Sequence, residues 1–232
     1  ERVYKKLNAK VAGAFRRDAR DAERRMTVKD LGTKRLETAR LILRRFTLED
    51  AQKMYEKLGR GDPEVTKFLT WSTHESAETS RQILKEWVAA YDNPEVYQWC
   101  IEEKESGEPV GSIGVVSRNE KAQSCEIGYC ISRSRWHKGI TTEALAEVMR
   151  YLFEEVGVLR LESRHDPKNP YSGEVMKNCG MRYEGTRIRA DWKQYRYLRL
   201  RFVWHGDICG RWKCGTADSG RADRGCGTKS SR

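Results

Sequence analysis

The fold is decided by the stretch Arg133-Ser134-Arg135-Trp136-His137-Lys138-Gly139-Ile140-Thr141-Thr142. The alternation typical of a strand ends before this stretch, and the periodicity typical of a helix begins after it. Before it, apolar and polar residues alternate from Ser124 to Ser132, which predicts a strand with one side facing a core. After it, apolar residues recur at the helical period up to Gly157, which predicts a helix with a left-handed residue at its end. These apolar residues are Leu145, Val148, Met149, Leu152 and Val156. The stretch is therefore predicted to be a strand-to-helix turn.

The chemistry of this turn suits an anion. The first turn of a helix leaves about four backbone N–H groups unpaired and carries a partial positive charge. Arg133, Arg135 and Lys138 add positive charge, and Gly139 lets the backbone pass close to a ligand. A pyrophosphate fits these features best. The turn alone is equally compatible with an ordinary connection whose basic side chains are solvated, and the chain contains neither a G-x-G-x-x-G nor a G-x-x-x-x-G-K-[ST] pattern.

The segment from Trp136 to Ala144 resembles the acetyl-CoA signature of the GNAT N-acetyltransferases, [QR]-x-x-G-x-[GA]. It is most similar to the W-x-K-G-Y-A-T-E-A pattern of the branch with the ribosomal-protein N-acetyltransferases (RimJ/RimL-like). Gly139 takes the glycine position, whereas Thr141 stands where Ala or Gly is usual. The resemblance covers roughly residues 35–206 and implies acetyl-CoA as the cosubstrate. It assigns coenzyme binding to Ile131, Arg133, Trp136, His137, Lys138, Gly139, Ile140, Thr141, Thr142 and Asn169.

The remaining periodicities predict an α+β protein with seven strands and about four helices. The predicted strands are Leu41–Phe46, Val96–Glu103, Val110–Ser117, Ser124–Ser132, Arg160–Arg164, Met181–Ala190 and Tyr195–Trp204. The predicted helices span 47–59, 76–91, 140–157 and 169–180, with a loop at Asp62-Pro63. This order, β-α-α-β-β-β-α-β-α-β-β, is the order of the GNAT fold, which implies a mixed, mostly antiparallel sheet.

Charge divides the chain into three parts. The formal net charge is +11, but residues 1–35 contribute +7 and residues 211–232 contribute +4, so the intervening part is neutral. Nucleic-acid binding is therefore expected at most through the basic ends. We predict a basic, peripheral extension at 1–34, an acetyltransferase domain at 35–209 and a disordered Gly/Ser/Arg-rich tail at 210–232.

The cysteine and hydropathy patterns indicate the cellular compartment of the protein. Seven cysteines form no C-x-x-C pair, and the four histidines are scattered, so neither a disulfide framework nor a metal site is predicted. No run of 18 apolar residues is present, so no membrane span is predicted. These patterns favour a cytoplasmic protein.

Acetyl transfer to an amine needs a proton acceptor, because an α-amine has a pKa of about 8 and a lysine amine one of about 10.4. Glu126 is the candidate base, since it lies on the polar side of its predicted strand next to Gly128, and GNAT members often place a basic Glu on this strand. The alternative is a solvent-facing Glu on a half-buried sheet. His165 is a weaker alternative base.

The leaving thiolate needs a hydrogen-bond donor. The Tyr that usually supplies it in this family is replaced here by Met176. Asn169-Pro170-Tyr171-Ser172 instead resembles the N-x-x-S pattern of the ribosomal-protein branch, which implies Ser172 near the coenzyme sulfur and Asn169 on the pantetheine arm. Two alternatives stay open: Tyr171 is the donor, or Asn169 and Ser172 are ordinary helix-start residues.

The acceptor is predicted to be a primary amine, either a protein N-terminal α-amine or a small molecule, acetylated directly in a ternary complex. Trp71, His74 and Trp87 border the acceptor site or belong to the core. A homodimer is possible in this family. The rival function is a non-catalytic acyl-CoA-binding or sensing module, which the missing Tyr and Thr141 favour.

Overall fold

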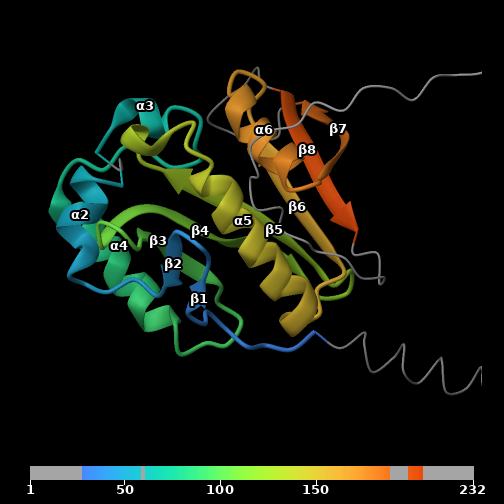
Figure 1. Cartoon of the computed structure of the whole chain (residues 1–232), viewed down its shortest axis with the longest axis horizontal. Coiled ribbons are helices and arrows are strands. Elements are labelled where there is room, and N and C mark those ends of the chain that lie inside the picture. Colours follow the sequence, from blue (N-terminus) through green and yellow to red (C-terminus); the bar gives the residue numbers. More distant parts are fainter. Residues whose placement is uncertain (1–27, 59–60, 189–197, 206–232) are drawn as a thin grey trace, which may run out of the picture.

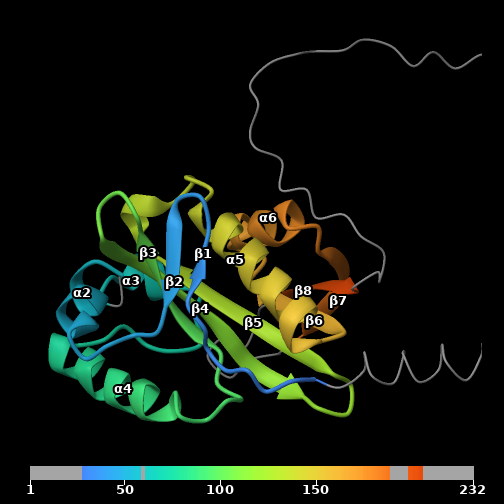
Figure 2. The ribbon, with the colours of Figure 1, turned by 60° about the horizontal axis from the view of Figure 1, so that its bottom comes forward.

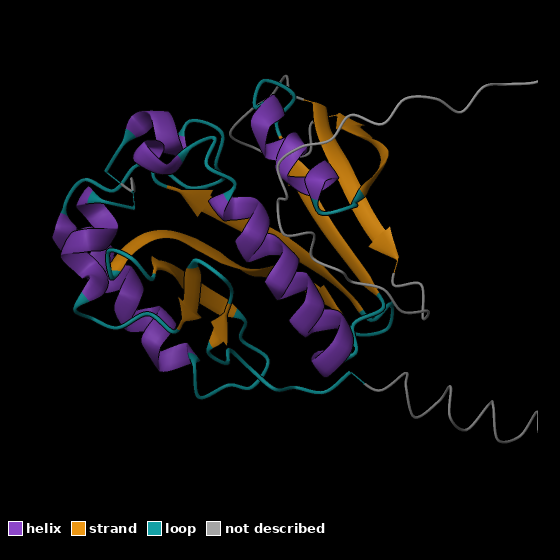
Figure 3. Ribbon diagram, viewed as in Figure 1, coloured by secondary structure: helices purple, strands orange, loops and turns teal. Residues whose placement is uncertain are grey.

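A mixed sheet of eight strands lies at the centre of the computed structural model, which describes residues 28–58, 61–188 and 198–205 (Figures 1 and 3). The strand order is β1-β2-β3-β4-β5-β6-β8-β7, and all neighbours are antiparallel except β5 and β6. The strands are β1 (Leu36–Glu37), β2 (Leu41–Arg44), β3 (Gln98–Glu103), β4 (Glu108–Asn119), β5 (Ser124–Ile131), β6 (Arg160–His165), β7 (Arg182–Ile188) and β8 (Leu198–His205).

Helices cover both faces of the sheet (Figure 2). One face packs against α5 (Ile140–Arg150) and α6 (Pro170–Asn178), and the other packs against α2 (Asp50–Glu56) and α4 (Ala77–Ala90). The alternation along β3 shows why: Trp99 and Ile101 belong to the core under α5, whereas Cys100 belongs to the core under α2 and α4. Each large apolar side chain buried in this way contributes about 1.5–3 kcal/mol.

The predicted α+β class and the mostly antiparallel sheet are confirmed. All seven predicted strands and all four predicted helices are present, although residues 189–197 between β7 and β8 lie outside the described residues. Three elements are additional, and one of them is a 3-10 turn at Arg133–Arg135, before α5. The short strand β1 pairs with β2, and α3 (Pro63–Thr66) forms where a loop was predicted, because the Asp62 carboxylate accepts the Glu64 N–H at 2.9 Å and caps it.

The long helix after Gly139 ends at Gly157 as predicted, and Gly157 has a left-handed φ of 88°. Its last turns are wider than an α-helix, however, and form a π-helical segment at Tyr151–Val156. The chain before β1 is bound to this segment. The Tyr151 hydroxyl donates to the Gly32 carbonyl at 2.8 Å, and the Lys29 N–H donates to the Val156 carbonyl at 2.7 Å.

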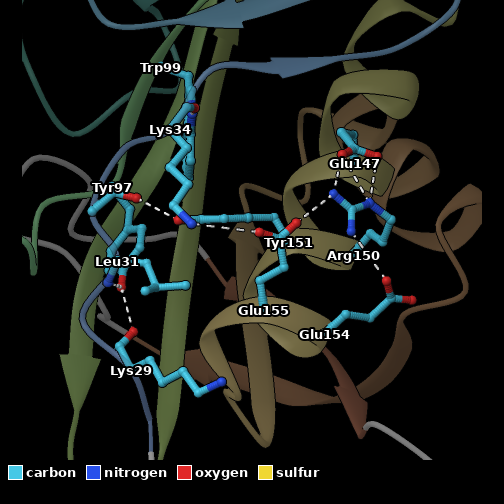
Figure 4. A network of polar contacts seen from close by, with 11 residues as sticks. Lys29, Leu31, Lys34, Tyr97, Trp99, Glu147, Arg150, Tyr151, Glu154 and Glu155 are labelled. Atoms are coloured by element: carbon cyan, nitrogen blue, oxygen red, sulfur yellow. Dashed lines mark hydrogen bonds and ion pairs between the residues drawn. The ribbon is translucent and has the colours of Figure 1, made fainter.

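Residues 28–34, which were predicted to belong to the peripheral extension, pack against the domain (Figure 4). The Tyr97 hydroxyl accepts from the Leu31 N–H and donates to the Lys29 carbonyl, both at 3.2 Å, and the Trp99 indole donates to the Lys34 carbonyl at 2.6 Å. The predictions for residues 1–27 and for the tail at 210–232 lie outside the described residues.

Candidate functional site

A cleft opens between the only two parallel neighbours in the described sheet. Backbone pairing of β5 with β6 covers Ser124–Glu126 and Arg160–Glu162 and stops there, although both strands continue. The cleft has a volume of about 1040 Å³. Its walls are the outer ends of both strands, the turn before α5, the first turn of α6 and the segment around α3.

The turn before α5 presents backbone N–H groups to this cleft. Gly139 holds the N-cap position with a left-handed φ of 72°, and no side chain caps the helix. A residue with a Cβ would be strained there, so the backbone conformation favours glycine. Gly139, Ile140, Thr141 and Thr142 all line the cleft. An uncapped helix N-terminus at the wall of a cleft is suited to phosphate oxygens.

Arg40, before β2, fixes the position of this turn. Its guanidinium donates to the Glu143 carboxylate at 2.6 Å and to the Lys138 carbonyl at 3.1 Å. Burial opposes ionisation of Glu143, but hydrogen bonds from the Thr38 hydroxyl and from Arg40 outweigh it and lower the Glu143 pKa. No local sequence signal points to Arg40 and Thr38, because their pairing with Glu143 joins segments about a hundred residues apart.

Eight of the ten predicted coenzyme-binding residues line the cleft: Ile131, Trp136, His137, Gly139, Ile140, Thr141, Thr142 and Asn169. The other two do not. Arg133 donates to the Asp62 carboxylate at 2.6 Å, and the Lys138 side chain is exposed. The His137 ring packs edge-on against the Tyr171 ring, with centroids 4.4 Å apart. This contact connects the turn before α5 to the first turn of α6.

Glu126 lines the cleft but is not alone there. Its carboxylate accepts from Arg164 Nε at 2.6 Å and also from Arg164 Nη2. Ile127 faces the α5 core, so Glu126 and Gly128 lie on the opposite face of β5. The two partners are both largely buried, with side chains 16% and 22% exposed. Arg164 therefore competes with any substrate amine for the Glu126 carboxylate.

Ser172 lies in the first turn of α6 and lines the cleft. Its hydroxyl donates to the Tyr129 hydroxyl at 3.2 Å, and the Tyr129 hydroxyl donates to the Ser172 carbonyl at 2.8 Å. Tyr171 is 64% exposed, whereas Met176 is completely buried in the core. Asn169 holds the N-cap position and Pro170 the first helical position, as predicted, but the Asn169 side chain makes no capping hydrogen bond.

Tyr129 and Arg164 are functional candidates that the sequence does not single out. Tyr129 falls in the apolar phase of β5, although the hydroxyl of a Tyr that is removed from solvent usually finds a hydrogen-bond partner. Arg164 closes a predicted strand and carries no motif. Both partnerships cross from β5 to β6 or to α6, and the sequence contains no local signal for them.

His165 is buried, at 7% exposed, and supports the loop between β6 and α6. Its Nδ1 lies 2.9 Å from the Asp166 carbonyl and 3.0 Å from the Asn169 carbonyl, and burial lowers its pKa. Its Nε2 faces Gly173, where an added Cβ would come within 2.6 Å. The ring is therefore held neutral between the loop and α6.

Aromatic residues from the segment around α3 and from α4 form part of the cleft wall. Trp71 and Trp87 line the cleft together with Phe68. His74 does not line it. The His74 side chain is buried, its Nδ1 lies 2.7 Å from the Ser80 hydroxyl, and its ring contacts Trp71 at a centroid distance of 5.6 Å.

Metal-ligating clusters and membrane-spanning helices can be assessed for the residues that the structure describes. Among those residues, no group of three His, Cys, Asp or Glu side chains is placed to hold a metal ion. Within the same ranges, none of the helices has the length and apolar character needed to cross a bilayer.

Comparisons with known proteins agree with this geometry. The family described as an acetyltransferase (GNAT) domain matches residues 40–182. The uncharacterized N-acetyltransferase YoaA of Bacillus subtilis is 30% identical over 151 residues, which cover 65% of this chain and 84% of that protein.

Two solved structures share the fold. The ribosomal-protein-S5-alanine acetyltransferase from Vibrio fischeri has 16% identity and a TM-score of 0.65 over 75% of this chain and 98% of its own. RimL, a ribosomal L7/L12 α-N-protein acetyltransferase in complex with coenzyme A, has 15% identity and a TM-score of 0.66 over 74% and 98%. The family and the fold that the turn and the strand order predicted are thus confirmed, and this chain belongs to the GNAT family as an N-acetyltransferase.

Proposed function

We propose that this protein transfers the acetyl group of acetyl-CoA directly to a primary amine in a ternary complex, with a protein N-terminal α-amine or a small-molecule amine as acceptor. One observation carries the proposal. A single cleft extends from the uncapped N-terminus of α5 to an aromatic wall at Phe68, Trp71 and Trp87, with Ser172 and Glu126 between them. The coenzyme phosphates would lie at the first end and the acceptor at the second.

The residues divide the chemistry as follows. The backbone N–H groups after Gly139 bind the pyrophosphate, and Asn169 binds the pantetheine arm. Glu126 takes up the proton that the amine loses as it attacks the thioester carbonyl, and Ser172 donates a hydrogen bond to the departing sulfur. Arg164 keeps the Glu126 carboxylate in place until the acceptor arrives.

The test uses the full chain with acetyl-CoA and follows thiol release. The acceptor panel contains N-terminal peptides, lysine peptides, polyamines, aminoglycosides and free amino acids. Thiol release with one class of amine, and a mass increase of one acetyl group on that amine, would support the proposal and identify the acceptor. Acetyl-CoA binding by calorimetry without turnover on any amine would instead support a sensing module.

A further inference from the structure

The Tyr129 hydroxyl joins the two walls of the cleft. It extends from β5 to the first turn of α6, where it contacts both the carbonyl and the hydroxyl of Ser172, at 2.8 and 3.2 Å. The last backbone pair between β5 and β6 is Glu126 with Glu162, so the strands have already separated at the height of Tyr129. Beyond that last pair, the Tyr129 side chain links β5 to α6.

The direction of these two hydrogen bonds is fixed. A phenol hydroxyl has one proton to donate and lone pairs to accept with. Burial raises the pKa of Tyr129 well above its ordinary value, so the hydroxyl stays protonated at working pH. Its proton goes to the Ser172 carbonyl, and its oxygen accepts the Ser172 hydroxyl proton.

We propose that Tyr129 is the positioning residue for the leaving sulfur: it holds the first turn of α6 at a fixed separation from β5 and orients the Ser172 hydroxyl until the thiolate forms. This inference rests on the proposed function and deepens it. As the amine nitrogen bonds to the carbonyl carbon, the C–S bond breaks and its electron pair goes to sulfur. The amine proton passes to Glu126. The Ser172 hydroxyl then turns from Tyr129 to the thiolate as a hydrogen-bond donor, and the backbone bond from Tyr129 remains.

Two other side-chain clusters in the described part support no separate proposal. The Arg40–Glu143 cluster supports the turn already assigned to the coenzyme. The cation–π contact of Arg118 with Tyr97 lies in a surface pocket beside Glu95 and Val96. No cysteine or histidine is among the described residues that line this pocket. Tyr129 is different because it touches a residue that the mechanism uses.

The test compares Tyr129→Phe with Tyr151→Phe. Tyr151 is buried and Tyr129 is partly buried, and each donates to a backbone carbonyl at 2.8 Å. The partner of Tyr151 is Gly32, away from the cleft. We expect Tyr129→Phe to lower kcat about tenfold, which corresponds to about 1.4 kcal/mol, with the Kd of coenzyme A changed less than threefold. Tyr151→Phe should leave kcat within twofold.

A double-variant cycle separates positioning from damage to the fold. The variant Tyr129→Phe combined with Ser172→Ala should be no slower than Ser172→Ala alone, because the hydroxyl that Tyr129 orients is then absent. A further loss of about tenfold in the double variant would overturn the proposal. An equal loss of kcat in Tyr151→Phe would overturn it as well.

Hydrogen exchange gives a readout that needs no turnover. Tyr129→Phe should speed exchange of the α6 amides after Ser172, and Tyr151→Phe should leave those amides unchanged. If the wild-type chain acetylates no amine, the proposed function fails, and these exchange rates still decide whether Tyr129 positions α6. Unchanged α6 exchange in Tyr129→Phe would contradict the positioning role.

Discussion

The Glu126 carboxylate accepts two hydrogen bonds from the Arg164 guanidinium, and this pair bridges β5 and β6 beside their last backbone pair. The pair has two roles to distinguish, one structural and one catalytic. It ties together the strands at the base of the cleft, and it holds the proposed base in place. Variants of the two partners distinguish these roles, because only Glu126 is proposed to take a proton.

Glu126→Gln should lower kcat/KM about a hundredfold, whereas Arg164→Gln should lower it tenfold or less. The glutamine preserves shape and one hydrogen bond but cannot accept the amine proton, and general base catalysis contributes about 10²–10⁴-fold. Steady-state thiol release at pH 7.5 measures both values. Equal losses in the two variants, with equal losses of thermal stability, would show that the pair serves only to hold the strands together.

Gly139→Val should abolish coenzyme binding, with a rise in the Kd of acetyl-CoA of more than tenfold in calorimetry. The left-handed φ of 72° costs a residue with a Cβ about 1–2 kcal/mol, and the side chain would occupy the place of the phosphate. Apart from neighbours in the chain, the Arg40 guanidinium at 3.6 Å is the only described group within 4 Å of the added Cβ, so the cost to the fold is the local backbone strain. Gly107→Val is a matched control, since Gly107 has a φ of 63° in a hairpin away from the cleft. Unchanged affinity in Gly139→Val would remove the turn from the coenzyme site.

Ser172→Ala should lower kcat by about ten- to a hundredfold with the KM for acetyl-CoA nearly unchanged, because its hydroxyl acts on the sulfur only as charge develops there. Tyr171→Phe should leave kcat within twofold, since that side chain is 64% exposed and its ring contact with His137 survives the change. The reverse order of effects would assign the donor role to Tyr171.

Stability should fall as the pH is lowered from 7.5 to 5.5, in part through His165. Burial lowers the His165 pKa in the folded state, while the unfolded chain has a value of about 6.5. The unfolded chain therefore binds more protons below pH 6.5, so the stability present above that pH is lost as the pH falls toward the lowered folded value. Urea unfolding midpoints at the two pH values measure the loss.

His165→Asn is the matched variant for this pH dependence. An asparagine amide replaces Nδ1–H as donor to the Asp166 and Asn169 carbonyls but does not titrate. Its unfolding midpoint should therefore depend less on pH than that of the wild type. An identical pH dependence in the two proteins would mean that other groups cause the loss.

The sequence was sufficient to predict those elements whose signal lies in consecutive residues. The alternation from Ser124 to Ser132, the helical period up to Gly157 and the Asn169-Pro170 helix start each reflect the geometry of a single element, and each element is present in the structure. Gly139 was identifiable for the same reason, because its left-handed backbone is a property of the turn in which it stands.

Short elements and the detailed geometry of a helix could not be predicted from the local sequence. The two-residue strand β1 exists only because β2 is there to pair with it. The π-helical end at Tyr151–Val156 coincides with hydrogen bonds to Lys29 and Gly32, which reach this helix from far along the chain. Residues 28–34 were predicted to be peripheral because they belong to a basic segment. Their contacts with Tyr97, Trp99 and Tyr151 form only once the core has folded.

The amino-acid sequence by itself determined the family and the order of elements, and most of the residues it predicted to bind coenzyme line the cleft, because a motif and a periodicity are written in consecutive positions. Only the tertiary structure decided which partners those residues have. Arg164 was brought to Glu126, Tyr129 to Ser172 and Arg40 to Glu143. Each of these contacts joins residues 38 to 103 positions apart, and which side chains meet at such a distance depends on how β5 and β6 separate and where the helices pack against them.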